Sequence, residues 1–165
     1  MWCGEMSFRM TKELFSFLAL TCFIGAASVA HADWQYTTWG ASADEVVAAS
    51  DGAAQVNSDR SKDPGDLVAK LVAPYQALGF DFEAYFIFDR ADQLQYVDLS
   101  PRNPLDCADI RHAVLNSYGQ PEDTGSFGLM KWWHRPSGNV VIFSEILTCE
   151  IRYMALHEPG VNSGL

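Results

Sequence analysis

Alternation of hydrophobic and polar residues marks the strands of this sequence. The clearest run covers residues 80–89, where hydrophobic residues at even positions face one way and acidic residues between them face the other. A second alternating run, residues 94–99, follows a short polar turn, so the two runs predict a hairpin. Weaker patterns of the same kind predict further strands at residues 70–79, 129–134, 140–146 and 148–154.

Two segments instead show the spacing of amphipathic helices. The first begins at Ser42, with Glu45 three residues later as a capping box, and is expected to end near Gly52. The second has Asp106 as its N-cap and ends at Gly119, ahead of a proline. Its apolar stripe consists of Cys107, Ile110, Val114, Leu115 and Tyr118.

The resulting order is helix, three strands, helix, three strands, which indicates an internal duplication with units at residues 40–100 and 105–156. We therefore predict an α+β fold: two tandem helix-plus-three-strand units forming one antiparallel sheet with both helices on one face. Residues 33–39 are expected to form a short strand or a packed aromatic arm. The polar residues 55–66 are expected to be an exposed loop and the most mobile part of the domain.

An N-terminal signal peptide is predicted at residues 1–32. A short apolar run follows basic residues, and Ala30-His31-Ala32 supplies the small-x-small pattern of a cleavage site. The run falls short of the ~20 residues that a spanning helix needs, so no membrane span is expected after removal of the signal. The expected mature protein is a single domain, residues 33–156, with a flexible tail, residues 157–165, and is periplasmic or secreted.

The charge of the chain narrows the choice of partners. The chain contains 11 Lys+Arg against 21 Asp+Glu, which gives a formal net charge of −10 at pH 7. Nucleic acids and anionic membranes are bound by clustered Lys and Arg, which this sequence lacks, so we expect neither as a partner. Solubility is the simplest reason for the acidity.

Cys107 and Cys149 are the two cysteines that remain when residues 1–32 are removed. An exported protein meets an oxidising compartment, so we predict a structural disulfide between them. Closing the loop between them would stabilise the fold by about 4 kcal/mol in the loop-entropy account. Metal ligation or a nucleophilic thiol are the alternatives, but the two cysteines lack the paired spacing of a zinc site.

Three short motifs carry a resemblance to a known family. The start at residues 40–46 combines a glycine, a hydroxyl cap, an acid and a valine, the second helix ends in Gly119-Gln120-Pro121, and residues 86–97 form a Phe-Asp-turn-hydrophobic hairpin. This organisation resembles modules of the β-lactamase inhibitor protein type and small outer-membrane assembly lipoproteins. It is also similar to uncharacterised exported bacterial proteins. The resemblance implies a fold and a tendency toward protein binding.

Candidate catalytic and metal-binding residues form no recognisable motif. His112, His134 and His157 are spread along the chain, whereas a metal site needs at least three convergent donors. The sequence contains no Gly-x-Ser-x-Gly, so a serine nucleophile on a sharp turn is not indicated. Paired carboxylates such as Glu83 or Glu145 leave a hydrolase open as an alternative. We expect no catalytic residue, cofactor or metal.

Trp132 and Trp133 are the most unusual candidate for a binding surface. Adjacent strand residues face opposite ways, so at most one of these tryptophans fills the core. The other is expected on an open sheet face beside Tyr85 and Ile87, where exposed aromatics suit a partner. In the alternative interpretation, the arm that contains Trp34 folds over them.

The function predicted from these features is that of an exported, non-enzymatic protein-binding or interaction module. Its expected partner is another exported or envelope protein, recognised through Trp132 or Trp133, Tyr85 and Ile87. A small periplasmic hydrolase and an envelope assembly or stability factor are the alternatives.

The predicted disulfide is tested by counting free thiols. In the unreduced mature protein, titration under denaturing conditions should detect no free thiol, because Cys107 and Cys149 are bonded to each other. Two reactive thiols per chain would contradict the disulfide.

Overall fold

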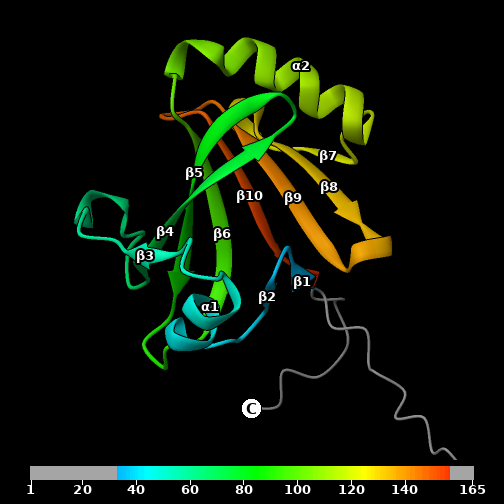
Figure 1. Ribbon diagram of the computed structural model, residues 1–165. Coiled ribbons are helices and arrows are strands. Elements are labelled where there is room, and N and C mark those ends of the chain that lie inside the picture. The colour runs from blue at the N-terminus through cyan, green and yellow to red at the C-terminus, as the bar shows by residue number, and fades with distance from the viewer. Residues whose placement is uncertain (1–32, 157–165) are drawn as a thin grey trace, which may run out of the picture.

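The computed structural model describes residues 33–156; the predicted signal peptide, residues 1–32, and the predicted tail, residues 157–165, lie outside the described residues. Figure 1 shows the arrangement of its elements. The helices are α1 (Ala43–Ala49) and α2 (Cys107–Tyr118), with short 3-10 turns η1 (Arg60–Lys62), η2 (Pro104–Asp106), η3 (Ser126–Gly128) and η4 (Arg135–Ser137). The strands are β1 (Asp33–Trp34), β2 (Thr37–Thr38), β3 (Gln55–Val56), β4 (Val68–Ala77), β5 (Phe80–Phe88), β6 (Leu94–Pro101), β7 (Asp123–Thr124), β8 (Met130–His134), β9 (Asn139–Ser144) and β10 (Glu150–Ala155).

Within residues 33–156, one antiparallel sheet of eight strands has the order β3-β4-β5-β6-β10-β9-β8-β7, and β1 pairs separately with β2. Two meanders, β4-β5-β6 and β8-β9-β10, are therefore joined through the pairing of β6 with β10. Ile151 lies opposite Leu99 and Met154 opposite Tyr96 in that junction. The segment with α2 carries the chain from one meander to the other.

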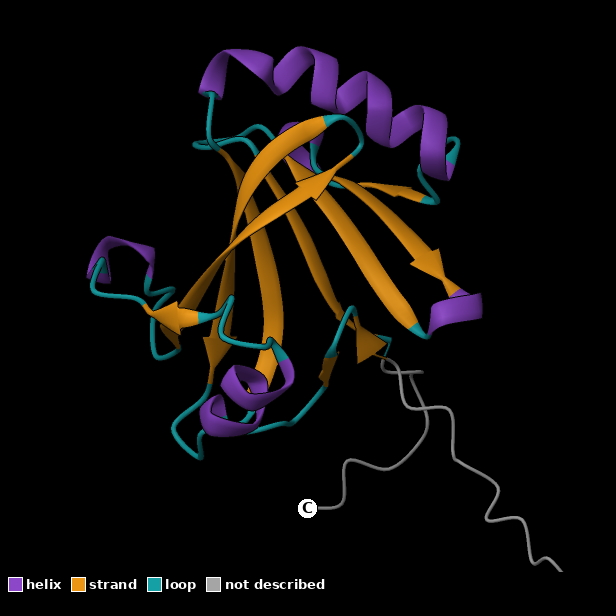
Figure 2. Cartoon of the chain, in the orientation of Figure 1, coloured by secondary structure: helices purple, strands orange, loops and turns teal. Residues whose placement is uncertain are grey.

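The predicted class of two helix-plus-three-strand units with both helices on one face is wrong. The described chain is mostly one eight-stranded sheet, and its helices α1 and α2 have only 7 and 12 residues. Figure 2 shows these helices at opposite ends of the sheet, so they form no layer over one face. The prediction missed β3 and β7, since a strand of two residues is too short to show alternation.

Helix termini follow the sequence signals only in part. The Ser42 side chain accepts from the Glu45 backbone N–H and the Glu45 carboxylate accepts from the Ser42 backbone N–H, which confirms the capping box. Gly119 ends α2 with a φ of 76°, a conformation that favours glycine. Asp106, predicted as an N-cap, makes no capping hydrogen bond and instead accepts from the Asn103 side chain at 2.7 Å.

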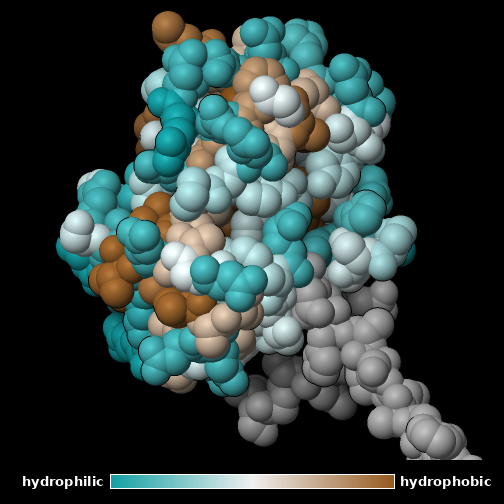
Figure 3. All heavy atoms as spheres, in the orientation of Figure 1, coloured by the Kyte–Doolittle hydropathy of each residue, from teal (hydrophilic) through white to brown (hydrophobic). Residues whose placement is uncertain are grey.

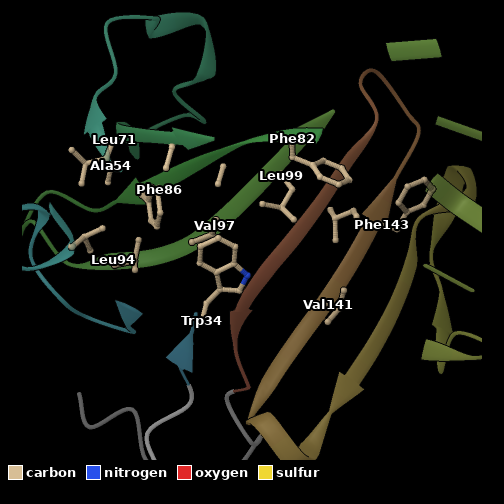
Figure 4. Packing of buried hydrophobic residues seen from close by; sticks show 14 of the residues in the cluster. Trp34, Ala54, Leu71, Phe82, Phe86, Leu94, Val97, Leu99, Val141 and Phe143 are labelled. Atoms are coloured by element: carbon tan, nitrogen blue, oxygen red, sulfur yellow. The ribbon is translucent and has the colours of Figure 1, made fainter. Parts of the chain in front are cut away.

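The main core lies on the inner face of the sheet, and its centre is filled by Trp34 (Figure 4). The Trp34 ring lies 5.0 Å from the Tyr75 ring, 5.7 Å from the Phe86 ring and 6.1 Å from the Tyr153 ring, centroid to centroid. The N-terminal arm, residues 33–39, thus packs on strands of both meanders, as the second interpretation of residues 33–39 required. From the helices, the fully buried side chains Val46, Ile110 and Val114 join the same core.

At both sides of the sheet, the edges of β4 and β8 that β3 and β7 leave unpaired are protected against pairing with another chain. On one side, β3 pairs only with Leu71 and Val72 of β4. Pro74 lies further along β4, beyond this pairing, where the edge of the strand is unpaired. Proline has no N–H to offer an added strand. On the other side, the Glu122 carboxylate accepts from the Trp133 backbone N–H at 3.1 Å.

Trp34 provides a test of the packed arm. Trp34→Ala should lower the free energy of unfolding by about 3–5 kcal/mol, because it leaves a large cavity beneath the arm. Trp133→Ala removes a partly exposed tryptophan from the opposite face, and should cost about 1 kcal/mol or less. Urea unfolding of both variants measures the difference; equal losses would contradict a central role for Trp34.

Candidate functional site

The strand register separates the predicted binding residues onto two faces of the sheet. Trp132 lies in the inner core at 3% exposure, and its indole N–H donates to the Gly119 carbonyl at 3.1 Å. Trp133 points to the outer face, in a cross-strand row that the pairings extend through Val140, Met154, Tyr96, Ile87 and Ala69. Tyr85 and Ile87 belong to the same outer face, so the structure brings three of the four candidate residues to one side.

Tyr85 and Ile87 are nevertheless not accessible as an open surface. They are 6% and 1% exposed, within a second, smaller core that includes Ala69 and Tyr96. The prediction of an open sheet face is therefore wrong for this half of the sheet, and Trp133, which is partly exposed, lies on the other half.

The segment that accompanies this second core is residues 57–67, which overlaps most of the predicted mobile loop, residues 55–66. Asn57 is buried, and its side chain donates to the Ala69 carbonyl at 2.9 Å. The Asp63 carboxylate accepts from the Ala69 backbone N–H, also at 2.9 Å. The Lys62 ammonium lies 5.0 Å from the centroid of the Tyr85 ring. Most of residues 55–66 are exposed, as predicted, but Asn57 and Asp63 attach the segment to the sheet through their side chains.

A groove on the outer face lies between this loop and residues 145–149. One part is a cavity of about 400 Å³ whose walls include Lys62 and Leu147, and whose floor includes Asp98 and Arg152. A neighbouring cavity of about 340 Å³ continues past the Cys107–Cys149 disulfide. The two cavities share Lys62, Ser100, Leu147 and Thr148, so they form one continuous groove.

The floor of the groove holds a fixed ion pair. Arg152 on β10 donates from Nε and Nη2 to the two carboxylate oxygens of Asp98 on β6, at 2.7 and 2.8 Å. The guanidinium also stacks on the Tyr96 ring, with its central carbon 4.0 Å from the centroid. Burial raises the pKa of the Asp98 carboxyl, while the hydrogen bonds and charge of Arg152 oppose that rise. Together, these contacts give Arg152 a defined orientation.

Lys62 and Tyr85 connect the loop to the floor. The Lys62 ammonium donates to the Ser100 hydroxyl at 3.4 Å, a long hydrogen bond. The Tyr85 hydroxyl donates to the Glu83 carboxylate at 2.7 Å. Burial, followed by this hydrogen bond, raises the pKa of Tyr85 to about 12, so its hydroxyl stays protonated at neutral pH.

The opposite wall, residues 145–149, is tied to the fold by the disulfide. Cys107 at the start of α2 and Cys149 are bonded in the structure, with their Cα atoms 5.7 Å apart. Leu147 projects from this wall with 94% of its surface exposed, although it is a large apolar side chain. An exposed leucine beside a groove favours contact with a partner.

Two other surface regions offer less. A cavity of about 430 Å³ lies between the arm and α1, but its acidic residue, Glu45, is used by the capping box. Hydrophobic residues also gather near β3 and α1 in Figure 3, where Val56 is 82% exposed. Neither region combines a hollow with free charged groups.

The candidate hydrolase residues are not assembled into a catalytic pair. Glu145 lines the smaller cavity, whereas Glu83 accepts from Tyr85 and lies 4.0 Å from Arg102. Among residues 33–156, no cluster of three or more His, Cys, Asp or Glu side chains could hold a metal. His112 and His134 are exposed, and His157 lies outside the described residues.

Five residues on which the groove depends were missed by sequence reasoning: Lys62, Asp98, Leu147, Glu150 and Arg152. The alternation of hydrophobic and polar residues placed Asp98 and Arg152 on polar strand faces. It could not show that β6 and β10, which contain these residues, are neighbours in the sheet. Leu147 gave a usable signal, as an apolar residue in a segment between two predicted strands.

Comparisons of this chain with protein-family models, curated protein sequences and solved structures found no significant match in any of the three. The resemblance to β-lactamase inhibitor protein modules and outer-membrane assembly lipoproteins therefore stays a prediction. In the described part of the chain, neither helix combines the length and hydrophobicity needed to cross a membrane. The disulfide is compatible with an oxidising compartment.

The ion pair can be tested through stability and pH. Arg152→Met leaves the Asp98 carboxylate buried without a counter-charge and should cost about 3 kcal/mol at pH 7. Arg152 opposes the rise that burial causes in the pKa of Asp98, so its removal should raise that folded-state pKa further and make ionisation of Asp98 oppose folding more strongly as pH rises through it. The loss should therefore be smaller at pH 4 than at pH 7, as measured by urea unfolding.

Arg135→Met is the matched control for this measurement. Arg135 is exposed and lies 4.0 Å from Glu122, so its removal should change stability by about 0.5 kcal/mol or less at either pH. A loss for Arg152→Met that is independent of pH would show that Asp98 is not the affected group.

Proposed function

We propose that the protein is an exported, non-enzymatic binding protein whose outer groove holds a segment of another exported or envelope protein. The observation that carries this proposal is the groove itself, with Leu147 94% exposed at its rim and a fixed Asp98–Arg152 pair in its floor. Binding needs positioned groups on a surface that stays in place without a ligand, and the disulfide and the bound loop supply that. A role in envelope assembly or stability would use the same groove.

The protected edges of the sheet favour binding of a partner in the groove over addition of a partner strand to the sheet. Partners that add a strand need a row of free N–H and C=O groups. Pro74 interrupts this row on β4, and Glu122 occupies the N–H of Trp133 on β8. A partner therefore finds its available hollows on the faces of the sheet.

A hydrolase is the second candidate, favoured by the contact between Lys62 and Ser100. An amine beside a serine hydroxyl can act as the base for a nucleophile. However, Lys62 lies over the Tyr85 ring at 5.0 Å, and its 3.4 Å bond to Ser100 is long. Ser100 also lies within β6 and not on a sharp turn. We therefore place binding first.

A photo-cross-linking side chain at position 147 tests the binding role. Introduced at Leu147 in the cells that produce the protein, it should yield a discrete covalent adduct with another exported protein, because this position borders the groove. The adduct is measured by electrophoresis and mass spectrometry.

Val47 is the control, as an apolar residue on α1 with 37% exposure that lines neither part of the groove. The same cross-linker at position 47 should not give this adduct. No adduct at position 147, or identical adducts at both positions, would reject the groove as the binding site.

A further inference from the structure

We propose that the groove recognises an extended polypeptide segment by a basic–acidic–basic order of side chains on one of its faces. This inference rests on the proposed binding function and names the chemistry of the partner. It follows from the order in which charged groups without a salt bridge line the groove: Glu145, then Lys62, then Glu150.

The order is given by which cavity each residue lines. Glu145 borders only the smaller cavity, beside the disulfide. Glu150 borders only the larger cavity, above the Asp98–Arg152 pair. Lys62 borders both cavities, so this residue lies where they meet. Along the groove the charges therefore alternate in sign: negative, positive, negative.

The other charged groups of the groove are already paired. Asp98 accepts two hydrogen bonds from Arg152, and Asp63 lies 3.1 Å from the Arg60 guanidinium. In residues 33–156, Lys62, Glu145 and Glu150 form no ion pair within 4.0 Å. These three charges are thus left for a ligand.

Two of the three groups are also held in position before a ligand arrives. Lys62 lies over the Tyr85 ring and donates to Ser100. The Glu150 carboxylate accepts from the Thr148 hydroxyl at 2.7 Å. A charge that is already oriented loses less conformational entropy when it binds its counterpart.

An extended polypeptide is the occupant that fits an open, continuous groove with alternating charge. In a strand, every second side chain points to the same side, so residues i, i+2 and i+4 present three side chains in line. A basic residue would face each glutamate and an acidic residue would face Lys62. The apolar surface of Leu147, on the wall shared by both cavities, would pack against the same segment.

Two labelled peptides of the same composition separate charge order from net charge. The first contains Lys-Val-Glu-Val-Lys, and the second contains the permuted sequence Lys-Val-Lys-Val-Glu. Binding to the mature protein, followed by fluorescence anisotropy, should be about fivefold tighter for the first, since each exposed ion pair contributes a small factor. The difference should shrink as salt is raised.

Variants of the protein assign the preference to the groove. Glu145→Gln and Glu150→Gln should each reduce the preference for the first peptide to about twofold or less. Asp51→Asn is the matched control, because it removes an exposed carboxylate elsewhere at a left-handed position that asparagine accepts. It should leave the preference unchanged.

Equal affinity for the two peptides, or a preference that survives both glutamine variants, would overturn the inference. If neither peptide binds while the cross-linker at position 147 still captures a partner, charge order is rejected and the binding function stands. If neither peptide binds and no adduct forms, both proposals fail.

Discussion

The pairing of β6 with β10 is the interaction on which the rest of the structure depends. It joins two halves that would otherwise be separate four-stranded sheets, and it aligns residues more than fifty positions apart in the chain. Each side of this junction is stabilised differently. On the inner face, Leu99 and Ile151 are buried in the main core. On the outer face, the Asp98–Arg152 pair spans the two strands, and the Arg152 guanidinium stacks on the Tyr96 ring. The groove therefore lies directly over the junction.

A buried ion pair is a costly way to join two strands, because both charges lose their hydration. Apolar residues at positions 98 and 152 could pack there without that penalty. The pair instead defines the register of β6 against β10, since two hydrogen bonds at 2.7 and 2.8 Å require one alignment. It also gives the groove a polar floor that an apolar pair would not provide. This one contact thus affects the stability of the junction, the register of β6 against β10 and the polarity of the groove floor.

Sequence patterns predicted the elements well and their assembly less well. The Phe-rich alternation of β5 and the capping box of α1 depend on neighbouring residues, so they could be read directly from the chain. The strands β3 and β7 exist only because longer strands present free edges, which no local pattern reveals. The attachment of residues 57–67 to the sheet was missed because Asn57 and Asp63 bind backbone groups of β4 that lie close only after folding. The groove was missed for the same reason, since its charged residues come from separate segments.

The position of Trp34 has a consequence for the two ends of the domain. Its slot is lined by Tyr75 from β4, Phe86 from β5 and Tyr153 from β10. The arm lies at the start of the described chain, whereas β10 is its last strand. A shortened domain that ends before β10 would therefore have no Tyr153 wall for the Trp34 ring, although the arm itself would be intact. The packing of the first described strand thus depends on the presence of the last one.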